Sequence, residues 1–246
     1  MKTICIDAGN TFVKLALMEN NEMQSLIVFS LDDVDGLLQH AASLPQVDAC
    51  VISSVISLPQ ELNHVLKQKA AYFMELTEKT PLPIRNLYQT PETLGKDRLA
   101  AVVGAYSLFP GKDILVFDAG TALTIDFIDR EGNYRGGNIS PGLNMRFRAL
   151  HENTQKISLL SQSDDYELIG ISTRSAIISG VQNGIIFEMN YYVHQFVNKI
   201  PTLVIILTGG DINFFVNKLE KHTFAEPNLI YIGLEKIVRF NKNLEP

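Results

Sequence analysis

Short apolar runs alternate with amphipathic segments along the chain, and this pattern predicts a mixed α/β fold. In the first half, apolar runs of strand length come first as a meander and then alternate with helical spacing. The predicted strands cover residues 2–7, 12–18, 24–30, 49–55 and 71–76. The predicted helices cover residues 33–43, 60–70 and 95–109.

The same order begins again near residue 113, after the turn sequence PGKD. The strands predicted here are ILVFDAG, ALTIDFID, the end of EGNYRGGNI, TLVIIL and residues 229–231. The helices are predicted from residue 142, at 173–199, at 211–221 and at 233–240. We therefore expect two similar α/β halves, residues 1–112 and 113–246, with their first turns facing each other across a cleft.

Composition narrows the functional classes. The chain has 246 residues, 46% hydrophobic and 20% charged, which is typical of a globular protein. Its net charge is −6 and it has no block of lysine and arginine, so we expect no nucleic-acid partner. The longest apolar runs are too short for a membrane span, and the N-terminus does not resemble a signal peptide. We expect a cytoplasmic protein with no membrane partner.

The tripeptide Asp-Ala-Gly ends the first strand of each half, at residues 7–9 and 118–120. One copy is explained by a hairpin turn alone, because Asp and Gly favour turns. Two copies at equivalent places favour a phosphate-binding function, since such a turn offers backbone N–H groups, a carboxylate for a cation and a threonine hydroxyl. Lys14 adds a positive charge to the first copy. The sequence contains neither a P-loop nor a GxGxxG motif, the commoner phosphate-binding patterns.

A second group of polar residues, Gly95, Asp97 and Arg98, opens the predicted helix in TLGKDRLAA. The structural explanation is an acidic residue placed in the first helical turn, where the helix dipole favours it. Beside a nucleotide the same residues can act in phosphoryl transfer, with Asp97 accepting a hydroxyl proton and Arg98 steadying the substrate or the transferred group. Two glycine-rich stretches, RGGNISPG and LTGGD, are either plain turns or places where a ligand approaches the backbone.

The motifs DAGNTFVK, GKDR, DAGTALTID, GGNISPG and LTGGD, in this order and spacing, resemble those of the type III pantothenate kinases. The resemblance covers nearly the whole chain. It implies the actin-like ATPase fold of the acetate-and-sugar-kinase superfamily, with two duplicated ribonuclease-H-like halves. It also implies ATP-dependent phosphorylation of pantothenate to 4'-phosphopantothenate, the first step of coenzyme A biosynthesis.

The resemblance also implies roles for individual residues. Asp97 is expected to be the general base, with Arg98 as the second catalytic residue. ATP is expected to contact Asp7, Ala8, Gly9, Asn10, Thr11, Phe12, Val13, Lys14 and Thr121. Pantothenate is expected to contact Tyr88, Gly95, Lys96, Asp97, Arg98 and Thr173, although Ser172 stands where the family pattern has Asn. Asp118 is expected to bind a monovalent cation, potassium or ammonium, while magnesium accompanies ATP. The family works as a homodimer, with pantothenate bound near the subunit interface and the long helix of the second half helping to form it.

Two other interpretations remain open from the sequence. The first is a non-enzymatic regulator, because the family also resembles accessory factors linked to transcription. The second is another small-molecule kinase or ATPase of the same superfamily. Turnover of ATP separates the first from an enzyme, and a panel of substrates separates the second from a pantothenate kinase.

Overall fold

The structure is a computed structural model, and it describes residues 1–244. Its contacts divide the chain into two compact units. Unit 1 comprises Met1–Leu108, Gly132–Tyr134 and the chain from Asn228 onward, and unit 2 comprises Phe109–Glu131 and Arg135–Pro227. The first division, between Leu108 and Phe109, lies close to the predicted boundary, whereas the C-terminal helix belongs to unit 1. The division into domains at residues 112 and 113 stays a prediction.

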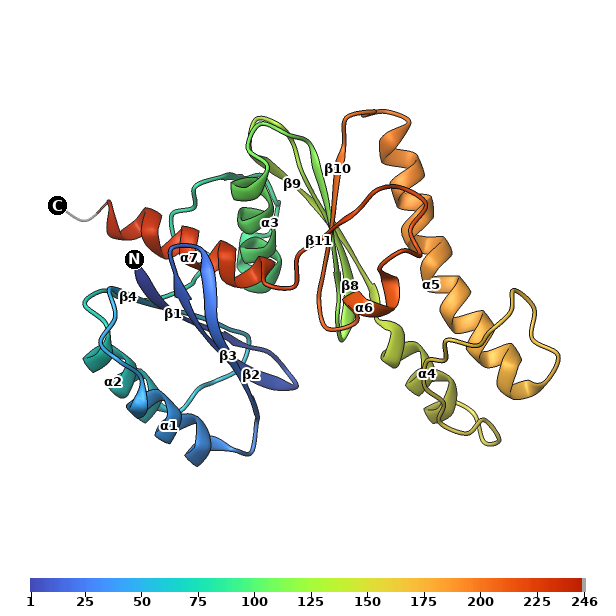
Figure 1. The fold of residues 1–246 in the computed structure, drawn as a ribbon, viewed down its shortest axis with the longest axis horizontal. Coiled ribbons are helices and arrows are strands. Elements are labelled where there is room, and N and C mark those ends of the chain that lie inside the picture. Colours follow the sequence, from blue (N-terminus) through green and yellow to red (C-terminus); the bar gives the residue numbers. More distant parts are fainter. Residues whose placement is uncertain (245–246) are drawn as a thin grey trace. The chain divides into compact units, whose positions relative to one another are not determined.

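Unit 1 is a five-stranded sheet covered by helices on both faces (Figure 1). Its strands are β1 (Lys2–Ala8), β2 (Phe12–Glu19), β3 (Glu22–Ser30), β4 (Ala49–Ser54) and β5 (Phe73–Glu75). Its helices are α1 (Val34–Ser43), α2 (Gln60–Lys69), α3 (Lys96–Leu108) and α7 (Leu229–Lys242), with a 3-10 turn, η1 (Pro91–Thr93), before α3. A two-residue strand, β6 (Arg85–Asn86), also belongs to unit 1, although it pairs with the second sheet.

The alternation of side chains along β1 produces two separate cores. Ile4 and Ile6 pack with α1 and α2 on one face, while Cys5 packs with α3 and α7 on the other. Because successive side chains of a strand point to opposite faces, this arrangement places Asp7 on the same face as Cys5. The carboxylate at the end of β1 therefore lies on the side of the sheet that carries α3.

Helices α3 and α7 approach each other through glycines. A Cβ atom at Gly104 would lie 2.3 Å from the carbonyl oxygen of Leu229, and one at Gly233 would lie 1.8 Å from that of Ala100. Only glycine fits at both positions, because any side chain would force the two backbones apart. The close contact fixes α3, whose first turn carries the GKDR motif.

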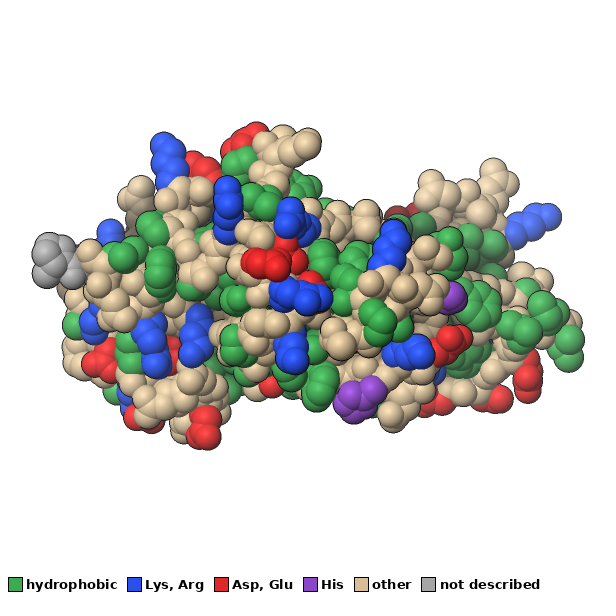
Figure 2. Space-filling view, turned by 90° about the horizontal axis from the view of Figure 1, so that it is seen from above, with side chains coloured by type: hydrophobic (Ala, Val, Ile, Leu, Met, Phe, Trp, Pro, Cys, Tyr) green, Lys and Arg blue, Asp and Glu red, His purple; other side chains and the backbone are tan. Residues whose placement is uncertain are grey.

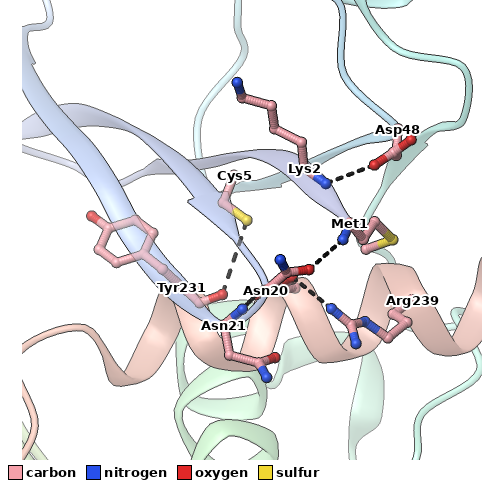
Figure 3. A network of polar contacts seen from close by, with 9 residues as sticks. Met1, Lys2, Cys5, Asn20, Asn21, Asp48, Tyr231 and Arg239 are labelled. Carbon is pink, nitrogen blue, oxygen red and sulfur yellow. Dashed lines mark hydrogen bonds and ion pairs between the residues drawn. The ribbon is translucent and has the colours of Figure 1, made fainter.

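Polar contacts tie α7 to the beginning of the chain (Figure 3). The N-terminal amine donates to Oδ1 of Asn20 at 2.6 Å, and the backbone N–H of Asn21 donates to Oε2 of Glu235 at 2.9 Å. Glu235 is fully buried and pairs with Arg239 at 2.9 Å. Asn20 and Asn21 have φ values of 53° and 70°, which suits the two-residue turn that joins β2 to β3. This corner of unit 1 is therefore held by its own turn and by α7.

Unit 2 is a sheet with three helices packed on one face. Its strands are β7 (Ile114–Ala119), β8 (Ala122–Ile128), β9 (Asn133–Pro141), β10 (Val204–Thr208) and β11 (Phe224–Ala225). Its helices are α4 (Leu143–Glu152), α5 (Thr173–Val197) and α6 (Ile212–Phe215). The first two residues of β9 group with unit 1, where they pair with β6.

The strand orders confirm the predicted duplication. Unit 1 has the order β3-β2-β1-β4-β5, and the second sheet has β11-β10-β7-β8-β9 followed by β6. In both, the first two strands pair antiparallel, and the fourth strand pairs parallel with the first. Each unit is therefore a ribonuclease-H-like fold, and the mixed α/β class is as predicted.

Two of the predicted elements are wrong. Residues 229–231 are the first turn of α7 and not a strand, because Leu229 and Tyr231 are buried against α3 in a helix. A short run of apolar residues has no period that separates a strand from a buried helix. The helix expected at 211–221 ends at Phe215, and Asn217 has a φ of 68°, which a continuing helix does not allow.

The surface in Figure 2 carries lysine and arginine side chains interspersed with acidic ones.

Two of the ion pairs within unit 2 involve buried carboxylates: Asp113 pairs with Arg130, and Asp129 pairs with Arg135. No helix formed by the described residues has both the length and the hydropathy of a membrane span.

Candidate functional site

The first Asp-Ala-Gly turn joins β1 to β2 in unit 1. The N–H of Gly9 donates to the carbonyl of Phe12 at 3.0 Å, which closes the turn. Asn10, Thr11 and Phe12 are exposed, so the backbone and the threonine hydroxyl are available to a ligand. Ala8 and Val13 are buried in the core, so any contact from them would be made by their backbone.

Asp7 and Lys14 are direct cross-strand partners, which places their side chains on the same face of the sheet. The pKa of Asp7 is raised to about 6, mainly by burial and also by the nearby carboxylate of Asp97, while the Lys14 ammonium acts in the opposite direction. The fold therefore brings Asp97, from the first turn of α3, close to the end of β1. A cation bound beside Asp7 and Asp97 would offset the repulsion between the two carboxylates.

The position of the Asp97 carboxylate is related to Gly95, two residues earlier in the chain. The N–H of Arg98 donates to Oδ1 of Asp97 at 2.8 Å, so the side chain folds over the first turn of the helix. A Cβ atom at Gly95 would lie 2.4 Å from the same oxygen. A side chain at position 95 would therefore displace the Asp97 carboxylate from this place. Lys96, which lies between Gly95 and Asp97, donates a hydrogen bond from its ammonium to the carbonyl of Ser54 at 3.0 Å.

Arg98 is buried and lies over an aromatic pair. Its guanidinium carbon is 5.6 Å from the centre of the Tyr88 ring, within the range of a cation–π contact. The Tyr88 ring stacks on that of Tyr134, with centroids 6.1 Å apart and planes inclined by 16°. Sequence reasoning found Tyr88 and Arg98 but missed Tyr134, which is fully buried and lies 36 positions beyond Arg98. No local motif marks it.

The second Asp-Ala-Gly turn joins β7 to β8 in unit 2. The N–H of Gly120 donates to the carbonyl of Ala122, two residues on, at 3.0 Å, whereas the acceptor in the first turn is three residues on. Backbone from two other segments crowds this turn: a Cβ atom at Gly142 would lie 2.2 Å from the Gly120 oxygen, and one at Gly209 would lie 2.5 Å from Oδ1 of Asp118. The glycines of GGNISPG and LTGGD therefore allow close backbone packing around Asp118. Thr121 is exposed at the tip.

Asp211 is the last residue of the LTGGD motif. Its N–H donates to the carbonyl of Ala119 at 2.9 Å, which holds LTGGD against the turn. Burial raises the pKa of its carboxyl group, which makes no capping hydrogen bond to α6. Thr173 is the first residue of α5 and is exposed, and the helix is capped by reciprocal hydrogen bonds between Ser172 and Ser175. Ser172 thus has a capping function of its own at the position where the family pattern has Asn.

Among residues 1–244, no three His, Cys, Asp or Glu side chains come together as a metal site. Magnesium usually binds through one or two carboxylates and completes its shell with phosphate oxygens and water. In unit 1, Asp7 and Asp97 are the carboxylates that can supply this contact.

The parts present in unit 1 are those that phosphoryl transfer requires. An exposed turn and an ammonium can hold phosphates, two carboxylates can hold a metal ion or accept a proton, and a buried arginine can neutralise charge. The remaining predicted residues of the ATP and cation contacts, Asp118 and Thr121, lie together at the turn in unit 2. Thr173 begins a separate helix of that unit.

The sequence profile of the type III pantothenate kinase family matches residues 3–195. The chain is 42% identical over 241 residues to a type III pantothenate kinase of Phocaeicola vulgatus, covering 98% of this chain and 99% of that protein. It is 38% identical over 241 residues to one of Porphyromonas gingivalis strain W83, covering 97% and 98% of the two chains.

Two solved structures have a similar fold. A structure described as a Baf family transcriptional activator from Campylobacter jejuni has a TM-score of 0.65 at 24% identity, with 98% of this chain and 99% of that chain covered. A ROK hexokinase from Thermus thermophilus has a TM-score of 0.51 at 10% identity, with 98% and 100% covered. At these identities the likeness concerns the fold alone. The extent and the level of identity with the curated sequences show that the chain is an enzyme that belongs to the type III pantothenate kinase family.

Proposed function

We propose that the protein transfers the γ-phosphoryl group of ATP to the hydroxyl of pantothenate that becomes the 4'-phosphate, the first step of coenzyme A biosynthesis. The observation that carries this proposal is the pair of Asp7 and Asp97 beside Lys14, in a chain whose family relatives are named for this reaction. The location of the reaction in the cytoplasm stays a prediction.

In the proposed reaction, Asp97 accepts the proton of the pantothenate hydroxyl as its oxygen attacks the γ-phosphorus. The bond from the γ-phosphorus to the bridging oxygen breaks, and ADP leaves with that electron pair. The geometry that supports this role is the carboxylate held at the start of α3 by the Arg98 N–H. Because phosphoryl transfer also depends on position and charge, the groups that hold the phosphates are expected to contribute beside the base.

The other proposed contacts divide between the units. The first turn and Lys14 hold the phosphates of ATP. Asp7 is the carboxylate that would contact the magnesium that accompanies ATP. Arg98, fixed on Tyr88, steadies pantothenate or the transferred group. Tyr88, Gly95 and Thr173 are the further pantothenate contacts proposed by family resemblance. In unit 2, Thr121 contacts ATP and Asp118 holds potassium or ammonium.

We also propose that the enzyme is a homodimer that uses an apolar surface of unit 2. The segment before α5 exposes Leu168, Ile169 and Ile171, with exposed fractions of 66%, 75% and 98%. Along α5, Phe187 and Tyr191 are 57% and 66% exposed. Large exposed apolar side chains can mark an interaction surface, and these two groups lie just before α5 and along its length.

Light scattering after gel filtration tests the dimer. Ile171→Asp is expected to give a monomer, because a charge placed in an apolar interface is desolvated without a partner. The matched control is Leu244→Asp, at a side chain of unit 1 that is 58% exposed. A wild-type protein that runs as a monomer, or a dimer that survives Ile171→Asp, contradicts the proposed interface.

The proposed substrate is tested by product analysis with ATP, magnesium and potassium. Pantothenate, pantetheine, glucose and N-acetylmannosamine are supplied one at a time, and the products are identified by mass spectrometry and phosphorus NMR. A phosphate ester on the predicted hydroxyl of pantothenate is the expected result. Phosphorylation of a sugar alone would reassign the substrate, and binding of ATP without any phosphorylated product would favour the regulator.

A further inference from the structure

We propose that Lys96 is a positioning residue, which ties the first turn of α3 to the end of β4 and so fixes the Asp97 carboxylate for proton transfer. This inference rests on the proposed function, and it differs from the family resemblance, which makes Lys96 a contact of pantothenate. The difference matters because the two roles affect different kinetic constants.

The tie is a single hydrogen bond between two elements that are distant in sequence. Nζ of Lys96 donates to the carbonyl oxygen of Ser54 at 3.0 Å, across 42 positions of the chain. Ser54 is the last residue of β4, and Lys96 is the first residue of α3. A charge-assisted bond of this kind is stronger than one between neutral groups.

The acceptor belongs to the strand end that borders the first turn. Ser54 pairs with Ala8 in the parallel register of β4 with β1, and the N–H of Val55 donates to the Ala8 carbonyl at 3.0 Å. The hydroxyl of Ser54 donates to the carbonyl of Ile56 at 2.6 Å, which holds the strand end in a fixed turn. The carbonyl that receives Lys96 is therefore part of the same rigid edge as Asp7.

Through this bond, the helix that carries Asp97 is attached to the strands that carry Asp7. Asp97 is the next residue after Lys96, so a shift of the lysine backbone moves the carboxylate with it. A displacement of about 1 Å in a reacting group can lower a rate roughly a hundredfold. Loss of the tie is expected to lower kcat while the substrate contacts persist.

The test compares three variants of the full chain. Lys96→Met keeps the length of the side chain but cannot donate, and Lys96→Arg keeps both charge and donor. The matched control is Lys69→Met, because Nζ of Lys69 also donates to a backbone carbonyl of unit 1, that of Leu44 at 2.8 Å. Lys69 ends α2 and has no predicted part in the site.

We expect Lys96→Met to lower kcat by roughly ten- to a hundredfold, with the KM values for ATP and pantothenate within about threefold of the wild type. Lys96→Arg is expected to recover most of kcat, and Lys69→Met to keep it. A large rise in the KM for pantothenate with kcat retained would instead assign Lys96 to the substrate. A kcat equal to that of Lys69→Met would also overturn the proposal.

Hydrogen exchange tests the tie without turnover. The N–H of Leu99 bonds the Gly95 carbonyl at 3.2 Å and reports on the first turn of α3. Its exchange should be faster in Lys96→Met than in the wild type and unchanged in Lys69→Met. Equal exchange rates in the wild type, Lys96→Met and Lys69→Met would refute the tie. A wild type without pantothenate-dependent ADP release would refute the proposed function alone.

Discussion

The two Asp-Ala-Gly turns occupy equivalent places in the two units, but the first is one residue longer and their surroundings differ. In both, the glycine N–H closes a hairpin at 3.0 Å. The strand partner of Asp7 is Lys14, whereas the partner of Asp118 is Thr124. Around the first turn, charged side chains gather; around the second, glycine backbones pack tightly.

This difference indicates that one motif can serve two functions, one in phosphoryl transfer and one in binding a cation. A turn with a neighbouring ammonium and a second carboxylate is suited to the charges that move in phosphoryl transfer. A carboxylate and backbone oxygens are the kinds of ligand that a cation binds, and the turn in unit 2 carries both. These differences therefore support the proposals that the chemistry belongs to the turn in unit 1 and that Asp118 and Thr121 hold a monovalent ion and ATP.

The largest expected effect comes from Asp97→Asn, which removes the base but keeps the shape of the side chain. We expect turnover to fall about 10²- to 10⁴-fold, the usual range for general-base catalysis. The affinity for ATP, measured by calorimetry, should stay within a few-fold of the wild type. Wild-type turnover in this variant would remove Asp97 from its role.

Lys14→Met tests the charge that distinguishes the first turn. A hydrogen bond to a charged group contributes about 1.5–3 kcal/mol, so kcat/KM for ATP should fall roughly ten- to a hundredfold. The control is Thr124→Val, at the equivalent register position of unit 2. If steady-state kinetics showed equal losses in both, the assignment of charge chemistry to the first turn would be wrong.

Asp118→Asn tests the second turn. Loss of the carboxylate should lower the rate in potassium about tenfold, corresponding to about 1.4 kcal/mol, and bring it close to the rate in sodium. Rates measured in potassium, ammonium and sodium salts check this. Full wild-type activity in sodium alone would count against a cation at Asp118.

Gly209→Ala tests the tight packing around the second turn. Gly209 has a φ of 98°, and its Cβ atom would lie 2.4 Å from the Ala119 oxygen. We expect unfolding by urea to show a loss of about 1–3 kcal/mol. Gly210→Ala is the control, since nothing lies within 4 Å of that position. Gly9→Ala should also be tolerated by the fold, because its nearest contact is 3.8 Å away.

The smallest expected effect concerns the stability cost of Asp7. Its folded-state pKa of about 6 lies above the ordinary value of 3.8, so ionisation of Asp7 destabilises the fold as pH rises through this window. Asp7→Asn removes this ionisation. It should stabilise the ligand-free protein by about 1 kcal/mol at about pH 8, a value that allows for the partial exposure of Asp7. The gain should shrink as the pH falls through that window. A gain in urea unfolding that is the same across the whole window would show that ionisation of Asp7 is not its cause.

Much of the fold could be predicted because its signals are local. The strands that end in Asp7 and Asp118 are apolar runs closed by turn residues, and α3 has clear helical spacing. The first turn of α7 was missed because its burial against α3 depends on contacts between distant parts of the chain. Propensity is a weak guide where such packing decides.

The candidate site divides in the same way. Asp7, Lys14 and Asp97 stand in recognisable motifs, so the sequence indicated them. The stack of Tyr134 on Tyr88 and the bond from Lys96 to Ser54 join segments that no motif links. Contacts of this kind follow only from the fold.

The central claim is that this chain phosphorylates pantothenate, and a coupled assay of ADP release tests it most directly. The assay contains ATP, magnesium and potassium, with and without pantothenate. We predict ADP release that depends on pantothenate. Release that is the same without pantothenate, or no release while ATP still binds, would contradict the claim.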